Sequence, residues 1–323
     1  MRVAVGTDQG VMVLKPGEMP EFPWTLVSHG LSTRRIQALA QFPEGDLLAA
    51  SDQGLVSRTR DGENWQTFAE GLASSNIHSL SLHPSEPEMV FAGTQPAGLF
   101  CSQDGAAHWE RMATFISVPS AGKWSYPIPP YRAKVKAIRQ HPQHPRALLV
   151  AVAMGGMIAS LDGGLTWSER HQGLSREVND LALHPARPAR VYAATGGGFF
   201  RSDDLASTWQ EAHQGLPYLF TQALALDPED PEKLMVGISQ QREGGSSLVA
   251  RSRDGGRTWQ VTSNGLPSLK GQCLTAMTSL PGFFIFGTDN GTLYFTRDFG
   301  ESWWPLRPGC PPIRALLGLP AKT

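Results

Sequence analysis

The sequence is poor in cysteine. Among 323 residues there are three, Cys101, Cys273 and Cys310, an odd number without any regular spacing. These cysteines do not show the spacing of a structural zinc site, and unpatterned thiols favour a reducing compartment. We therefore expect a cytoplasmic protein with structural thiols, no metal and no cofactor.

Long apolar segments and an excess of charge are also missing. The longest apolar stretch, residues 147–160, contains Gly155 and Gly156 and is too short to cross a bilayer. Met1 and Arg2 lead directly into a predicted strand, without the pattern of a signal region. The formal net charge is -1, so no whole-chain argument supports nucleic acid or a membrane surface as a partner. We expect neither nucleic-acid binding nor membrane insertion.

The sequence does contain a repeated eight-residue box. Its clearest copies are residues 160–167 and 252–259, with more divergent copies at 102–109, 202–209 and 296–303 and a shortened one at 59–65. The box tryptophans are Trp65, Trp109, Trp167, Trp209, Trp259 and Trp303. Self-similarity at a period of about 40 to 50 residues is typical of propeller blades or solenoid arrays.

The segments around each box favour a propeller. Each period holds four short β-rich runs separated by turns, as expected for a four-stranded blade, and no long stretch has helical periodicity. The first runs are residues 36–43, 77–84, 135–142, 178–185, 221–228, 274–281 and 313–320. The chain begins with a second run and ends with a first run, so residues 311–320 should complete the blade begun by residues 1–30, which would leave no free sheet edge. The sequence thus predicts an all-β, single seven-bladed β-propeller domain spanning residues 1–323.

The box resembles the Asp-box, or bacterial neuraminidase repeat, of sialidases, xyloglucan-cleaving glycoside hydrolases, sortilin-type receptors and photosystem II assembly-factor propellers. The segment from His184 to Thr195 looks most like the xyloglucanase and sortilin version. This resemblance implies a propeller scaffold, whereas function depends on sites added to it. The box acids have a local explanation, because an Asp in a tight turn accepts hydrogen bonds from the turn itself. We expect them to be structural.

The enzyme families give one alternative function. The sialidase Arg-Ile-Pro segment has only Arg35-Ile36-Gln37 as its counterpart, without the proline. Xyloglucanases place a catalytic carboxylate in a Thr-Asp-x-Gly turn, which resembles residues 7–10 here. The resemblance therefore implies a glycoside hydrolase alternative, with Asp8 as base opposite a second carboxylate such as Asp180. The same turn recurs at residues 51–54 and 288–291, which favours a structural role for Asp8.

Alignment of the seven first runs gives the main functional signal. One column is polar throughout and predicts a polar ring at the channel mouth opposite the boxes: Gln37, His78, Lys136, Asn179, Gln222, Thr275 and Arg314. These side chains could bind a ligand or could hydrogen-bond to each other and to channel water. In the next column Asp180 is a lone carboxylate, expected to pair with Lys136 or Arg314 or to have a shifted pKa.

An insertion at residues 114–132 is expected on the same face. Its Trp124, Tyr126 and Tyr131 offer flat surfaces for stacking on a sugar ring or a peptide, and the surroundings are basic, with Arg34 and Arg35 nearby. A second insertion, residues 239–247, should reach this face with little functional weight. The sequence therefore predicts a non-catalytic binding or assembly propeller for a small polar or anionic ligand, a carbohydrate or a protein segment.

Overall fold

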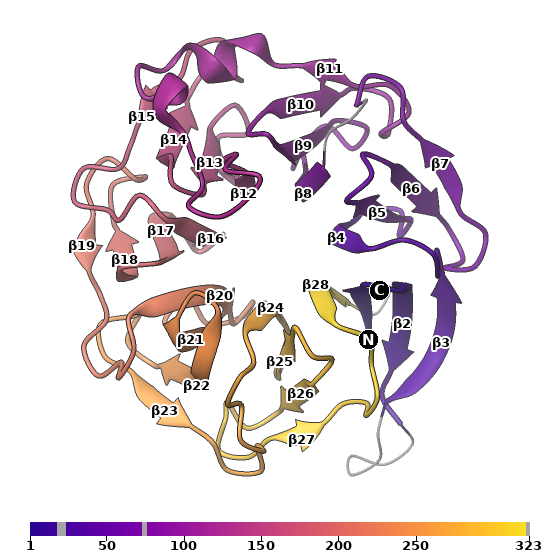
Figure 1. Ribbon diagram of the computed structural model, residues 1–323, viewed down its shortest axis with the longest axis vertical. Helices are drawn as coiled ribbons and strands as arrows, with labels where there is room; N and C mark the ends of the chain where they lie inside the picture. Colours follow the sequence, from indigo (N-terminus) through magenta and orange to yellow (C-terminus); the bar gives the residue numbers. More distant parts are fainter. Residues whose placement is uncertain (18–23, 73–75, 321–323) are drawn as a thin grey trace.

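The computed structural model describes residues 1–17, 24–72 and 76–320, and within them the chain forms seven four-stranded antiparallel sheets. Figure 1 shows these sheets as blades arranged around a central axis, with one edge strand of each blade innermost. The two short 3-10 helices, Ala113–Ser117 and Ala121–Lys123, both lie in the long insertion. The predicted all-β, seven-bladed β-propeller is confirmed.

The strands occupy four concentric positions. The innermost strands are β28 (Ile313–Leu319), β4 (Ile36–Gln41), β8 (Asn76–Leu82), β12 (Val135–Gln140), β16 (Val178–His184), β20 (Phe220–Leu226) and β24 (Leu274–Leu280). The second strands are β1 (Arg2–Thr7), β5 (Leu47–Ser51), β9 (Val90–Gln95), β13 (Leu148–Val152), β17 (Arg187–Thr195), β21 (Leu234–Gln241) and β25 (Phe283–Thr288). The third strands are β2 (Gly10–Lys15), β6 (Val56–Thr59), β10 (Leu99–Ser102), β14 (Gly156–Ser160), β18 (Gly198–Ser202), β22 (Gly244–Ser252) and β26 (Leu293–Thr296). The outer strands are β3 (Thr25–Gly30), β7 (Gln66–Phe68), β11 (Glu110–Arg111), β15 (Ser168–Glu169), β19 (Gln210–Glu211), β23 (Gln260–Thr262) and β27 (Trp304–Pro305).

The two ends of the chain meet in one blade. Strand β28 pairs antiparallel with β1, with Arg2 opposite Leu319 and Gly6 opposite Ala315. The N- and C-terminal segments therefore lie side by side in Figure 1, where the yellow β28 adjoins the indigo blade of β2 and β3. This closure converts what would be an open edge into a hydrogen-bonded ladder.

Adjacent blades pack through small residues on the second strands. A methyl group placed on Gly287 of β25 would lie 2.5 Å from Cγ2 of Ile313, which is fully buried on the next blade. Gly237 on β21 faces Leu274 in the same way, at 2.8 Å from its Cβ. The missing side chain allows the branched residue of the neighbouring blade to approach the strand backbone.

The box carboxylates hold their own turns. Asp162 Oδ1 accepts hydrogen bonds from Ser160 Oγ (2.8 Å) and Thr166 N (2.9 Å), and its Oδ2 accepts one from Thr166 Oγ1 (2.6 Å). These bonds, those from Thr166 foremost, lower the pKa of Asp162 to about 2. Asp254 has the same partners in its box, Ser252 and Thr258. The carboxylates act as turn acceptors, as expected.

Candidate functional site at the channel mouth

The predicted polar ring coincides with a backbone irregularity that recurs in every blade. In β16, Val178 pairs with Thr195 and Asp180 pairs with Ala194, so Asn179 has no partner on β17. The register shifts in the same way at each of the other ring residues: Gln37, His78, Lys136, Gln222, Thr275 and Arg314. A β-bulge turns the extra residue out of the regular alternation. The ring is thus produced by seven equivalent bulges.

All seven ring residues line one recess of about 370 Å³, which we call the channel mouth. Its other lining residues are Arg35, Tyr126, Lys134, Phe220, Arg242, Cys273, Leu274 and Asp289. The strand register places it opposite the boxes: Ile36 pairs with Ser51 at the ring end of the blade, whereas Leu47 pairs with Gln41 and Thr59 at the box end.

Several ring side chains are engaged by neighbouring backbone. Asn179 Nδ2 donates to the carbonyl of Thr221 (2.9 Å), and Thr275 Oγ1 donates to that of Ile313 (2.6 Å). Gln222 Nε2 donates to the carbonyl of Arg242 (3.3 Å). These three polar side chains link one blade to the next or support a loop, which agrees with the internal hydrogen-bonding alternative at their positions.

Asp8 pairs with two arginines, Arg314 on the closing strand β28 and Arg35 just before β4. Its Oδ1 and Oδ2 accept hydrogen bonds from Arg314 Nε (2.6 Å) and Nη2 (2.8 Å), and Arg35 Nε lies 3.0 Å from Oδ1. The hydrogen bond from Arg314 is the main reason why the pKa of Asp8 lies below its usual value. Asp8 N also donates to the carbonyl of Pro312 (3.1 Å). The carboxylate therefore orients both guanidinium groups at the channel mouth.

Asp180 does not pair as expected. Its Oδ1 accepts from Arg139 Nη2 (3.0 Å) and from the amide of Leu181 (2.8 Å), and its Oδ2 accepts from the amide of Leu224 (3.3 Å). The prediction of an ion pair with Lys136 or Arg314 is thus wrong, because the residue after the bulge resumes strand pairing and its side chain contacts β12 and β20 instead. Burial raises the pKa of Asp180.

In the part of the chain that the structure describes, Lys134 and Lys136 are the cations of the channel mouth that have no counterion. Among the described residues, neither ammonium group has a hydrogen bond or a carboxylate within ion-pair distance, and the nearest defined contact is the Tyr126 ring, whose centre lies 4.9 Å from Lys134 Nζ. Removal from water lowers the pKa of both, that of Lys134 to about 7, with repulsion from Lys136 as a further cause. Burial and the same two lysines lower the pKa of His78 to about 3, so its imidazole is neutral.

The two insertions meet over this recess. Arg242, at the turn between β21 and β22, makes a bidentate ion pair with Glu177, with Nε 2.8 Å from Oε1 and Nη2 2.7 Å from Oε2. Its guanidinium also lies 5.5 Å from the centre of the Tyr126 ring, which belongs to the long insertion. Arg242, Glu177 and Lys134 were not among the predicted site residues. Lys134 belongs to the basic surroundings noted beside the long insertion, and Arg242 lies in the second insertion, which was expected to reach this face with little functional weight.

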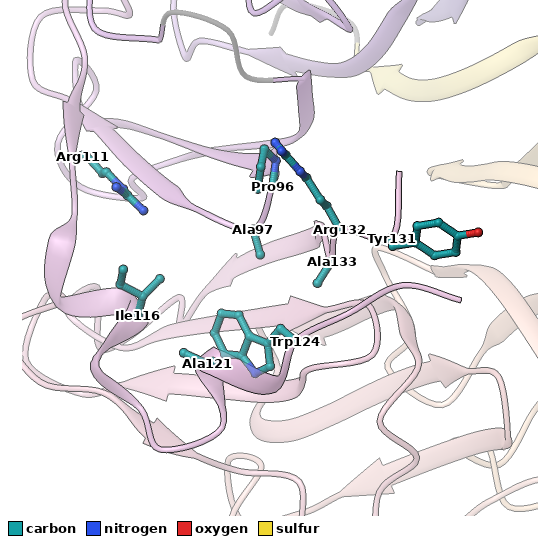
Figure 2. A pocket seen from close by; sticks show the side chains of 10 residues that line it. Pro96, Ala97, Arg111, Ile116, Ala121, Trp124, Tyr131, Arg132 and Ala133 are labelled. Carbon is teal, nitrogen blue, oxygen red and sulfur yellow. The ribbon is translucent and has the colours of Figure 1, made fainter. Parts of the chain in front are cut away.

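The remaining predicted residues lie elsewhere. Arg34 Nη1 donates to Ser57 Oγ (2.8 Å) and Thr67 Oγ1 (2.9 Å), outside the lining of the channel mouth. Trp124 and Tyr131 line a second recess of about 560 Å³, shown in Figure 2.

The three insertion aromatics do not form one platform. Trp124 is half-buried, donates from Nε1 to Ser120 Oγ (2.9 Å) and packs on Phe115 at 5.5 Å between ring centres. Tyr131 is exposed and turns away from Trp124 in Figure 2, while Tyr126 lies at the channel mouth.

Within residues 1–17, 24–72 and 76–320, no group of three His, Cys, Asp or Glu side chains is arranged to hold a metal ion, and no helix is long and apolar enough to cross a membrane.

Comparisons with known proteins place the chain among propellers of two kinds. No protein-family model matches it, and no curated protein matches its sequence. Similar solved structures include the GH74 xyloglucanase from Xanthomonas campestris, with a TM-score of 0.72 and 17% identity over 94% of this chain and 52% of that one. Another is an ancestral GH74 enzyme, with a TM-score of 0.63 and 18% identity over 80% of this chain and 36% of that one. A third, YCF48 bound to D1 peptide, has a TM-score of 0.60 and 14% identity over 84% of this chain and 82% of that one.

The chain spans about half or less of the length of these GH74 enzymes. At such identities the likeness shows a shared propeller fold.

Proposed function

We propose that this protein is a non-catalytic binding module whose channel mouth recognises an anionic group of a small ligand or of a protein segment. The observation that carries the proposal is the pair Lys134 and Lys136, two recessed ammonium groups without a counterion among the described residues. A charge held away from water is costly unless it is paired, so an incoming anion gains more here than at an exposed lysine.

The surroundings favour recognition over chemistry. Arg242 is positioned by Glu177, and Arg35 and Arg314 are positioned by Asp8, so these guanidinium groups are held in place before a ligand arrives. Tyr126 and Phe220 add aromatic surface beside the cations. The similarity to YCF48 bound to D1 peptide supports a protein segment as the occupant, and the similarity to GH74 enzymes supports a carbohydrate. The proposal includes a cytoplasmic location, which the unpatterned cysteines support.

Calorimetric titration of two matched peptides tests the proposal. Tetraglutamate should bind the wild-type protein, and tetraglutamine, which has the same length but no side-chain charge, should not. Lys136→Gln should lose at least about tenfold in affinity for tetraglutamate. The control Lys15→Gln, at an exposed position near the box end of β2, should bind as wild type. Equal binding of both peptides, or no effect of Lys136→Gln, would count against the channel mouth as the site.

Glycoside hydrolysis is the second candidate. Its support is the GH74 similarity together with the opposite pKa shifts of Asp8, which is lowered, and Asp180, which is raised, a pattern found in acid and base pairs. The contacts weigh against it, because both oxygens of each carboxylate already accept hydrogen bonds within the protein. Release of reducing ends from xyloglucan, abolished in Asp8→Asn and in Asp180→Asn, would establish this activity and replace the first proposal.

A further inference from the structure

The charges of the channel mouth divide into two sides. On one side, Arg35 and Arg314 share Asp8, and Asp52 lies 3.9 Å from Arg35. Asp289 is also on this side, where its charge acts on Arg314. The two arginines on this side therefore lie near at least as many negative charges as they carry positive ones.

The other side contains Lys134 and Lys136. The acids whose charges act on these lysines are Glu177 and Asp180. Glu177 is neutralised by Arg242 at 2.7 Å, and Asp180 by Arg139 at 3.0 Å. The ammonium groups of Lys134 and Lys136 are therefore left without a paired carboxylate among the described residues, while the charge of Glu243 acts on Arg242.

On the basis of the proposed binding function, we propose that the ligand presents a dianionic group, either a phosphate monoester or a short dicarboxylate, and that Lys134 and Lys136 bind this group together.

The electrostatics of the pair explain why one negative charge is insufficient. The two ammonium groups repel each other, and both are partly withdrawn from water. A monoanion can neutralise the charge of only one ammonium group, so the other still lacks a counterion. A dianion can neutralise both charges. Arg242 adds a donor on the same side, because its Nη1 makes no hydrogen bond with the described residues while Nε and Nη2 hold Glu177. A recess of about 370 Å³ is large enough for such a group together with the part of the ligand that carries it.

The experiment is a calorimetric titration of the full chain at pH 6.5 and constant ionic strength with four small anions. Sulfate and malonate represent dianions of tetrahedral and dicarboxylate geometry, and nitrate and acetate represent monoanions. Inorganic phosphate, which is mainly a monoanion at this pH, is added as a fifth probe so that a tetrahedral monoanion can be compared with the sulfate dianion. We expect at least one dianion class to bind about tenfold or more tightly than both monoanions. Lys134→Gln and Lys136→Gln should each lower the affinity for that dianion to the affinity measured for the monoanions. Lys15→Gln should leave it unchanged.

The outcomes separate this inference from the proposal on which it rests. Preference for sulfate over malonate indicates a tetrahedral dianion such as a phosphate monoester, and the reverse preference indicates a dicarboxylate. If monoanions and dianions bind equally and both depend on Lys136, the channel mouth binds anions but the dianion inference is wrong. If tetraglutamate and all five anions fail to bind, the proposed function fails as well. Dianion binding that is unchanged in both lysine variants would place the site elsewhere and overturn the inference.

Discussion

The protonation of Lys134 predicts how anion affinity depends on pH. Its pKa of about 7 means that the ammonium form, which binds the anion, gives way to the neutral amine as the pH rises through 7. If only the protonated form binds, affinity for sulfate should be nearly constant below about pH 6.5. It should then fall by about fivefold between pH 7 and pH 8, or about 1 kcal/mol. Sulfate is the suitable probe because it remains a dianion throughout this range.

Among the other titratable groups facing Lys134, His78, Tyr126 and Arg242 keep their states over this interval, and Lys136 is the exception. His78 on β8, with a pKa of about 3, is neutral, and burial raises the pKa of Tyr126 above its usual value. Arg242, on the β21–β22 turn, remains protonated because its hydrogen bonds to Glu177 raise its pKa. Lys136 on β12 also has a lowered pKa and adds to any decline at higher pH.

Titration calorimetry at half-unit steps from pH 6 to pH 9 measures the profile, and buffers of different ionisation enthalpy report the proton taken up on binding near pH 7.5. Lys134→Arg keeps its charge and should bind sulfate with a smaller decline, to which only Lys136 contributes, whereas Lys134→Gln should bind weakly at every pH. A flat wild-type profile, or the same slope in Lys134→Gln, would refute the reasoning.

Three further predictions concern stability and the second recess. Lys134→Gln should raise the free energy of unfolding measured in urea at pH 6.5. The gain should shrink as the pH rises from about 7 toward 10.5, because the lowered pKa means that the charged lysine destabilises the folded state at low pH. Ile313→Ala, at a fully buried position of the closing strand, should lower the urea-derived free energy of unfolding by about 2–5 kcal/mol; a change below about 1 kcal/mol would show that β28 contributes little to closure. Trp124→Ala should leave sulfate affinity within about twofold of wild type by calorimetry, because this ring lines the other recess; a larger loss would connect the two recesses.

The repeat made the fold and the ring accessible from sequence. Each blade places equivalent residues in equivalent positions, so aligning the seven first runs collected Gln37, His78, Lys136 and their equivalents before any contact was known. The same periodicity located the closing strand, because the chain begins and ends within one repeat.

Tertiary structure decided what the ring side chains meet. The seven bulges that aim them into the channel mouth depend on hydrogen-bond register, which alternating polarity does not specify. Arg242 reaches Glu177, 65 residues away in sequence, because the β21–β22 turn extends to the residue that precedes β16. Asp180 pairs with Arg139 and not with a ring cation. A repeat determines which residues are equivalent, since equivalent blades bury equivalent positions. The partners of a charged side chain depend instead on loops and on neighbouring blades that differ from one repeat to the next, and those contacts leave Lys134 and Lys136 as the uncompensated pair.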